Sequence, residues 1–185
     1  MTEQEKKENK SVYGDAPEDE TIESHTLAII VDNEPGVLAR VIGLFSGRGY
    51  NIESLTVAEI DHEKNLSRIT VVSTGTPQVI DQIKHQLGRL VPVHKVVDLT
   101  VSGPHVSSEV ALIKIVREKD KHDAAIEKAK AFDAEIVDVT DESLIFEVTG
   151  DAQTVTNFIN IMKPMGLTNV TRTGIVALMR GPKTI

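Results

Sequence analysis

The chain has 185 residues, of which 40% are hydrophobic and 3% aromatic, and it carries a formal net charge of −8. It contains no cysteine, which excludes disulfides and thiolate metal sites. The acidity, with no basic stripe to meet a phosphate backbone, argues against nucleic-acid binding, and no apolar run reaches membrane-spanning length. This length is enough for one ordinary domain or two small ones.

Residues 1–24 are predicted to be a disordered acidic tail. They hold eight acidic and three basic residues and almost no large apolar side chain, so they cannot bury enough surface to form a core. The first residues are charged rather than apolar, so we expect no secretory signal and a cytoplasmic protein.

Residues 25–101 are predicted to form a first folded unit of the ferredoxin-like order β-α-β-β-α-β. Its first helix carries one apolar stripe, with Leu38, Val41, Ile42 and Phe45 at helical spacing. In chain order we expect a strand at 25–31, a helix at 37–48, strands at 51–60 and 66–73, a helix opened by Thr76 and Pro77, and a strand at 93–101.

A second unit of the same order is predicted at 109–185, after a linker at 102–108 that is rich in Ser, Gly and Pro. Its expected elements are a strand at 109–116, a helix at 121–132, strands at 134–140 and 143–149, a helix at 151–164 and a last strand within 166–179. The predicted fold class is therefore α+β, with two ferredoxin-like units.

The turn between the first strand and the first helix is the most informative segment. A strand that turns through Pro35 and Gly36 into a helix leaves free backbone N–H groups, which form a seat for a small carboxylate. The amides of Gly36, Val37 and Leu38 could supply that seat, and Asn33 could bind an ammonium group. Such a turn also occurs for geometry alone, so this segment favours an amino-acid receptor without requiring one.

No catalytic or metal-binding residues are predicted. None of the six histidines lies in a familiar metal spacing, and neither a nucleophile elbow nor a glycine-rich phosphate loop is present. Two alternatives stay open: a small ferredoxin-like enzyme, which would need a titratable cluster in a pocket, and a nucleic-acid module, which would need stacked aromatics and basic strands.

Three segments carry a family resemblance: residues 33–58, 66–70 and 174–181. The region 25–101 resembles an ACT domain, and residues 25 to 182 resemble the regulatory small subunits of acetolactate synthase (acetohydroxyacid synthase). An ACT-type sensor for another enzyme remains the rival within this class, and the long run 33–58 argues against it.

The resemblance implies a non-catalytic regulatory subunit. Such a subunit binds the catalytic large subunit, raises its activity and confers feedback inhibition by a branched-chain amino acid, usually valine. It implies no cofactor on this chain; thiamine diphosphate, magnesium and FAD are expected on the catalytic partner. It also implies a homodimer through the ACT domain, with no nucleic-acid or membrane partner.

By resemblance, the effector lies between two paired ACT domains. The matching positions are Asn33, Gly36, Val37 and Leu38 of one chain, with Asn51 and Ile52 of the partner chain. The second unit has Arg117-Glu118-Lys119-Asp120 after its first strand in place of a Pro-Gly turn. We therefore expect no effector site there.

Overall fold

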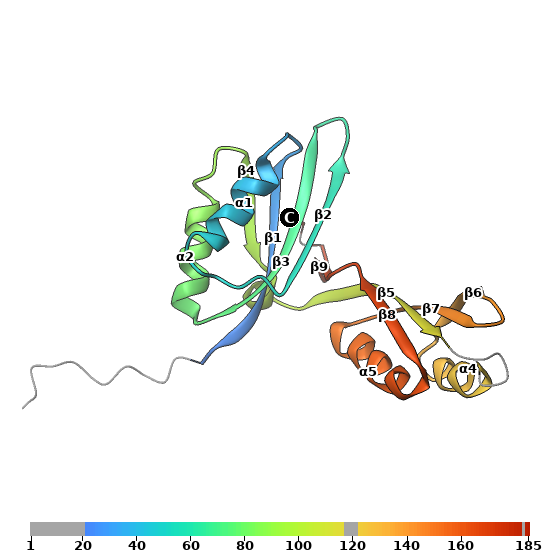
Figure 1. Ribbon diagram of the computed structural model, residues 1–185. Helices are drawn as coiled ribbons and strands as arrows, with labels where there is room; N and C mark the ends of the chain where they lie inside the picture. The colour runs from blue at the N-terminus through green and yellow to red at the C-terminus, as the bar shows by residue number, and fades with distance from the viewer. Residues whose placement is uncertain (1–20, 117–121, 183) are drawn as a thin grey trace, which may run out of the picture.

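The computed structural model describes residues 21–116, 122–182 and 184–185. Residues 1–20 of the predicted tail and the turn at 117–120 lie outside that range. The described part forms two lobes that are joined by one long strand and by the C-terminal segment (Figure 1). None of the helices in the described part is long and apolar enough to cross a membrane.

The first lobe is a four-stranded antiparallel sheet in the order β2-β3-β1-β4, with both long helices on one face (Figure 1). Its elements are β1 (Glu23–Asp32), α1 (Val37–Ser46), β2 (Ser54–Asp61), β3 (Leu66–Gly75), α2 (Pro77–Leu87) and β4 (Val93–Asp98). β2 is thus an edge strand, and its outer side pairs with no strand in the described part of the chain.

The core of this lobe lies between the sheet and the helices, because alternate residues of β1 and β3 turn toward them. Leu27 and Ile29 pair with Val71 and Ile69, and these four side chains are at most 1% exposed. Burial of such side chains contributes roughly 1.5–3 kcal/mol each. Thr76 caps α2 and Pro77 occupies its first turn, as predicted. Gly49, in the turn after α1, adopts the left-handed conformation with φ +70°.

The second lobe repeats the order, with strand order β6-β7-β5-β8 and helices α4 and α5. Its elements are β5 (His105–Val116), α4 (His122–Lys130), β6 (Glu135–Val139), β7 (Ser143–Gly150), α5 (Ala152–Met162), a 3₁₀ turn (Lys163–Met165) and β8 (Leu167–Arg172). Its core includes the rings of Phe146 and Phe158, whose centroids are 6.0 Å apart in an edge-to-face arrangement. The α+β class and the ferredoxin-like pattern are confirmed.

Three predicted boundaries are wrong. Glu23 and Ser24, placed in the tail, belong to β1 because they pair with Gly75 and Thr74. Residues 105–108, placed in the linker, begin β5 because they pair with β9 (Val176–Met179). The single strand expected within 166–179 is two strands, since the chain leaves β5 after Thr173 and turns at Gly174, where φ is +87°.

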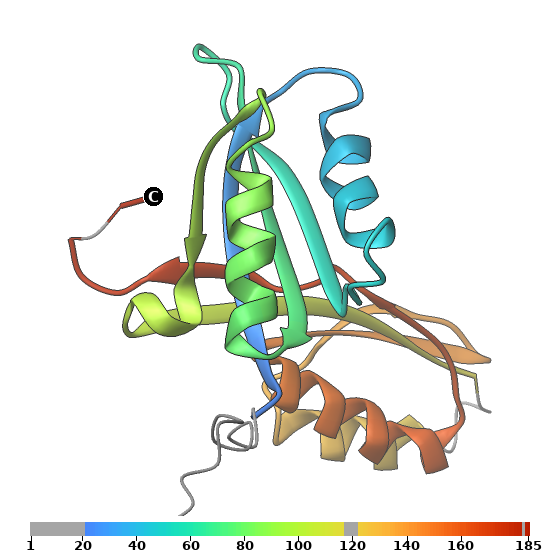
Figure 2. The ribbon, with the colours of Figure 1, turned by 90° about the vertical axis from the view of Figure 1, so that its left-hand side faces the viewer.

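The C-terminal segment joins the two lobes. β9 crosses the face of the first sheet that lies opposite α1 and α2 (Figure 2). Ala177 packs there with Ala28 of β1 and with Leu99 of the short helix α3 (Leu99–Ser102), in a small third cluster. The side chain of Ser54 accepts a hydrogen bond from the backbone N–H of Ile175 at 2.8 Å.

Candidate functional site

The turn before α1 is held by backbone hydrogen bonds from two sides. Asn33 donates its N–H to the carbonyl of Asn65 at 2.7 Å, and Asp32 donates to the carbonyl of Pro92 at 2.9 Å. The side chains of His94 and Asp32 also meet, with Nε2 and Oδ1 2.6 Å apart. The turn is therefore fixed against the β2–β3 turn and against the start of β4.

Gly36 is the N-cap residue of α1 and has φ +86°, a left-handed conformation that side-chain-bearing residues rarely adopt. A Cβ placed on Gly36 would meet no atom within 4 Å. The glycine is therefore required by the backbone, and the space beside it is open.

The start of α1 has no side-chain cap, whereas α2 and α5 are capped by Thr76 and Asp151. Val37 donates its N–H to the carbonyl of Glu34 at 3.3 Å, so this predicted donor is already used. The amides of Leu38 and Ala39 donate to no acceptor within the described residues. These two groups and the helix dipole are the part of the turn that favours an anion.

The sequence prediction did not include the amide of Ala39, because it took the three backbone donors to be those of Gly36 and the two residues after it. With Gly36 as the N-cap, the second and third helical residues are Leu38 and Ala39, and their N–H groups are the free ones. The left-handed glycine immediately before the apolar stripe is the signal that could have identified Ala39. The Val37 side chain belongs to the core at 4% exposure, while that of Leu38 is 37% exposed.

Asn51 and Ile52 lie beyond the other end of α1, just before β2. The helix has ten residues and so separates them from Gly36 by about 15 Å. Ile52 packs on the first core, and the carbonyl of Asn51 accepts a hydrogen bond from Ser73 Oγ at 2.6 Å. One chain thus brings together Asn33, Gly36, Val37 and Leu38, but it does not bring Asn51 and Ile52 to them.

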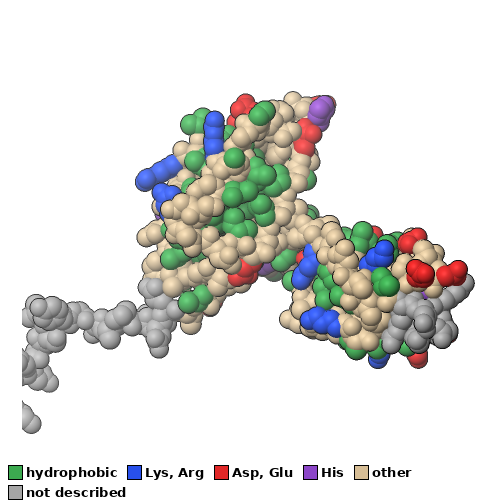
Figure 3. Space-filling view, in the orientation of Figure 1, with side chains coloured by type: hydrophobic (Ala, Val, Ile, Leu, Met, Phe, Trp, Pro, Cys, Tyr) green, Lys and Arg blue, Asp and Glu red, His purple; other side chains and the backbone are tan. Residues whose placement is uncertain are grey.

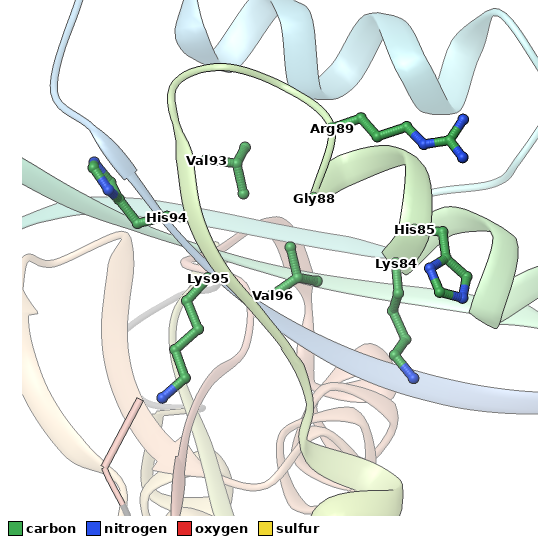
Figure 4. Close-up of a pocket in the computed structure, with 8 residues that line it drawn as sticks. All are labelled: Lys84, His85, Gly88, Arg89, Val93, His94, Lys95 and Val96. Atoms are coloured by element: carbon green, nitrogen blue, oxygen red, sulfur yellow. The ribbon is translucent and has the colours of Figure 1, made fainter.

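A basic pocket of about 460 Å³ lies between the end of α2 and β4 (Figure 4). Lys84, Arg89 and Lys95 contribute to its lining, but Figure 4 shows Arg89 directed away from the two lysines. Lys84 is also paired with Asp81 at 2.9 Å. The cations do not converge on one point, so we assign this pocket no ligand.

Two acidic groups are buried against a basic partner. His25 Nδ1 lies 2.8 Å from Asp98 Oδ2, with the two side chains 4% and 2% exposed. Asp98 also caps α3 by accepting from the N–H of Thr100. Arg172 pairs with Glu109 at the start of the second sheet. The His25–Asp98 pair is thus closed to a substrate and holds strand ends in place, whereas Arg172 is 36% exposed and lines, with Glu109, a surface pocket of about 440 Å³.

Within residues 21–116, 122–182 and 184–185, no group of three or more His, Asp or Glu side chains could hold a metal ion. The candidate site predicted from the sequence is the open helix start at Gly36, where the amides of Leu38 and Ala39 are free.

Comparison with known proteins identifies the family. Residues 108–181 match the family described as the small subunit of acetolactate synthase, and residues 27–95 match the ACT domain of the AHAS small subunits. The chain belongs to the acetolactate synthase small-subunit family. This confirms the resemblance seen in the sequence, including the ACT domain.

Several relatives in this family align with most of this chain. A probable acetolactate synthase small subunit from Archaeoglobus fulgidus is 45% identical over 86% of this chain and 98% of its own length. The acetolactate synthase small subunit of Mycobacterium leprae is 40% identical over 88% of this chain and 95% of its own. The crystal structure of the acetolactate synthase small subunit from Thermotoga maritima matches with a TM-score of 0.78 at 36% identity. The match covers 87% of this chain and 99% of that chain.

Proposed function

We propose that this chain is the non-catalytic regulatory subunit of acetolactate synthase. It binds the catalytic large subunit, raises its activity, and makes it sensitive to a branched-chain amino acid, with valine as the effector. The observation that carries this proposal is the uncapped start of α1, where the amides of Leu38 and Ala39 face an open space beside Gly36.

The chemistry of that helix start suits an amino-acid carboxylate. Two unpaired N–H groups at a helix N-terminus attract an anion through hydrogen bonds and through the helix dipole. Asn33 is exposed at the same turn and offers a side-chain oxygen to an ammonium group. A ligand of about eight heavy atoms would bind with micromolar to millimolar affinity, roughly −8 to −4 kcal/mol.

A homodimer through β2 would complete this site. When two copies pair antiparallel at that edge, the start of one β2 lies against the end of the other. Asn51 and Ile52 immediately precede the start of β2, and the turn at Asn33 is hydrogen-bonded to Asn65 just beyond its end. Such a pairing would therefore bring Asn51 and Ile52 of one chain beside Asn33 and Gly36 of the other.

The surface beside β2 supports this interface. Hydrophobic side chains gather between α1 and β2 on the face shown in Figure 3. Leu38 and Val57 are 37% and 41% exposed, and Ile52 and Leu55 are partly buried beside them. A second copy that pairs with the edge strand would satisfy its free backbone groups and cover this surface.

Regulation would follow from the shared site. Valine that binds only the paired arrangement of two ACT domains shifts the population toward it, and the catalytic subunit responds to that change. A coupling of about 1–3 kcal/mol is the usual scale of such effects. Thiamine diphosphate, magnesium and FAD would belong to the catalytic subunit, and this chain would carry no active site.

We propose that the two lobes have different roles and that the protein works in the cytoplasm. The first lobe, β1 to β4, would bind the effector as the ACT domain, and the second lobe, β5 to β8, would form a separate ferredoxin-like domain. The acidic residues 1–24 have no assigned role.

Reconstitution tests this function. The purified chain, mixed with the acetolactate synthase large subunit of the same organism, should raise acetolactate production several-fold and make it inhibitable by valine. Unchanged production with and without this chain would contradict the proposal. Retained activation without any response to valine, leucine or isoleucine would contradict the effector site alone.

A further inference from the structure

A second cavity, of about 370 Å³, lies between the first sheet and the ribbon formed by β5 and β9. Its floor is the sheet face opposite the helices: Thr56 pairs with Thr70, while their neighbours Leu55 and Val71 face the helix-side core. Its other wall is the face of the ribbon that carries the cross-strand pairs Val106–Leu178 and Ser108–Val176. It is therefore distinct from the open start of α1.

The walls of this cavity are apolar and accessible. Ile60 and Val106 are 52% and 51% exposed, and Val176 and Leu178 are 49% and 64% exposed. A group of large aliphatic side chains left in contact with water is unfavourable, and such groups mark binding sites. The volume lies within the range of small-molecule pockets.

One charge lies in this apolar setting. Arg68 of β3 donates from Nη2 to the carbonyl of Ala177 at 2.6 Å, but a guanidinium carries five N–H donors. Within the described ranges no carboxylate lines the cavity, and Arg68 forms no ion pair there.

Partial burial also lowers the pKa of Arg68 below its usual value, because the charged form loses hydration. A desolvated cation gains most from an anion that can accept its remaining donors.

We propose that this cavity binds a short branched aliphatic monocarboxylate, whose carboxylate is held by Arg68 and whose chain packs against Ile60, Val106 and Leu178. The hydroxyl-bearing Thr70 also lines the cavity, while the hydroxyl of Thr56 donates to the carbonyl of Thr173. A zwitterionic amino acid is a poorer fit, because its ammonium group would lie close to Arg68 with no carboxylate to balance it.

Such a ligand would contact both lobes at once. Thr56, Arg68 and Thr70 belong to the first sheet, whereas Val106 and Leu178 belong to the β5–β9 ribbon. Binding would therefore stabilise the arrangement in which the ribbon lies across the first sheet.

An NMR titration of the ¹⁵N-labelled full chain with isovalerate tests this site. The expected result is saturable shifts in the amides of Thr70, Val176 and Leu178, with isovaleramide, the neutral isostere, binding at least about tenfold more weakly. Equal binding of the amide, or no saturable shift in these amides, would overturn the proposal.

Two variants and one control complete the test. Leu178→Ser changes an exposed side chain and should weaken isovalerate binding by about threefold to tenfold. Arg68→Gln should weaken it at least about tenfold, and unchanged affinity in both variants would overturn the proposal. Gly36→Asp is the control, because it should abolish valine binding at the start of α1 and leave isovalerate binding in the cavity intact. Loss of the isovalerate-induced shifts in this variant would contradict a separate cavity.

Discussion

The backbone N–H of Asn33 lies 2.7 Å from the carbonyl oxygen of Asn65, which ties the turn before α1 to the turn between β2 and β3. This hydrogen bond places the open helix start at one end of the edge strand. Asn51 lies at the other end of that strand, beyond α1. A site that uses both ends of β2 therefore requires two chains.

Gly36→Asp should abolish valine inhibition and leave activation of the large subunit intact, because it puts a negative charge beside the amides of Leu38 and Ala39. The matched control is Gly36→Asn, which has the same shape and tolerates φ +86° equally well but is neutral. Both variants should lose about 1 kcal/mol of stability from backbone strain. Inhibition curves for the two reconstituted enzymes should differ at least about tenfold in the valine required.

Val57→Lys should break the proposed dimer, since a lysine at the centre of an edge strand opposes strand pairing. Val57 is 41% exposed, so the fold of each chain should survive. Val91→Lys is the control, because Val91 is 94% exposed and lies between α2 and β4. Sedimentation velocity should show monomers for the first variant and dimers for the second; dimers in both would rule out the β2 edge.

Gly174→Ala should destabilise the crossing of the C-terminal segment over β2. A Cβ at Gly174, where φ is +87°, would lie 2.8 Å from Thr56 Oγ1. Gly181→Ala is the control for backbone strain alone. Gly181 also has a positive φ, +76°, but a Cβ there would meet nothing within 4 Å. The first variant should lose about 1–3 kcal/mol more than the second in urea unfolding. Equal losses of stability in the two variants would mean that the contact between Gly174 and Thr56 does not stabilise the crossing.

Asp151 should make the free energy of unfolding of the second lobe depend on pH in the acidic range. Hydrogen bonds from the backbone and side chain of Thr154 lower the pKa of this N-cap carboxyl below 3.8. The ionised cap therefore stabilises the folded state fully above pH 3.8, and that contribution is lost as the pH falls through the lower folded value. Asp151→Asn keeps a capping oxygen that does not titrate. The difference in melting temperature between wild type and variant should shrink between pH 5 and pH 2, roughly the window of carboxylate titration; a constant difference would exclude this role for Asp151.

Local chemistry made the elements of the two units predictable. The apolar stripe of α1, the Thr76-Pro77 start of α2 and the alternation of Leu144, Phe146 and Val148 in β7 each specify an element within a short window. The turn at Gly36 was likewise visible from its own residues.

Long-range pairing was not predictable in the same way. Residues 105–108 form a strand only because Val176–Met179 returns to pair with them, and their own sequence contains two serines after a Gly-Pro pair. The cavity beside Arg68 depends on the same return of the chain. Asn51 was predicted as a site residue only from the family resemblance. Its proposed role requires a second copy of the chain, and no local sequence pattern indicates such a pairing.

Valine binding by mixed dimers tests the shared site most directly. Gly36→Asp and Asn51→Ala should each greatly weaken valine binding in calorimetry, because each damages both sites of a symmetric dimer. Co-expression of the two variants in equal amounts should restore about one quarter of the wild-type sites, since half of the dimers are mixed and each mixed dimer has one intact site. No recovery in the mixture, or unchanged binding by Asn51→Ala alone, would contradict a valine site built by two chains.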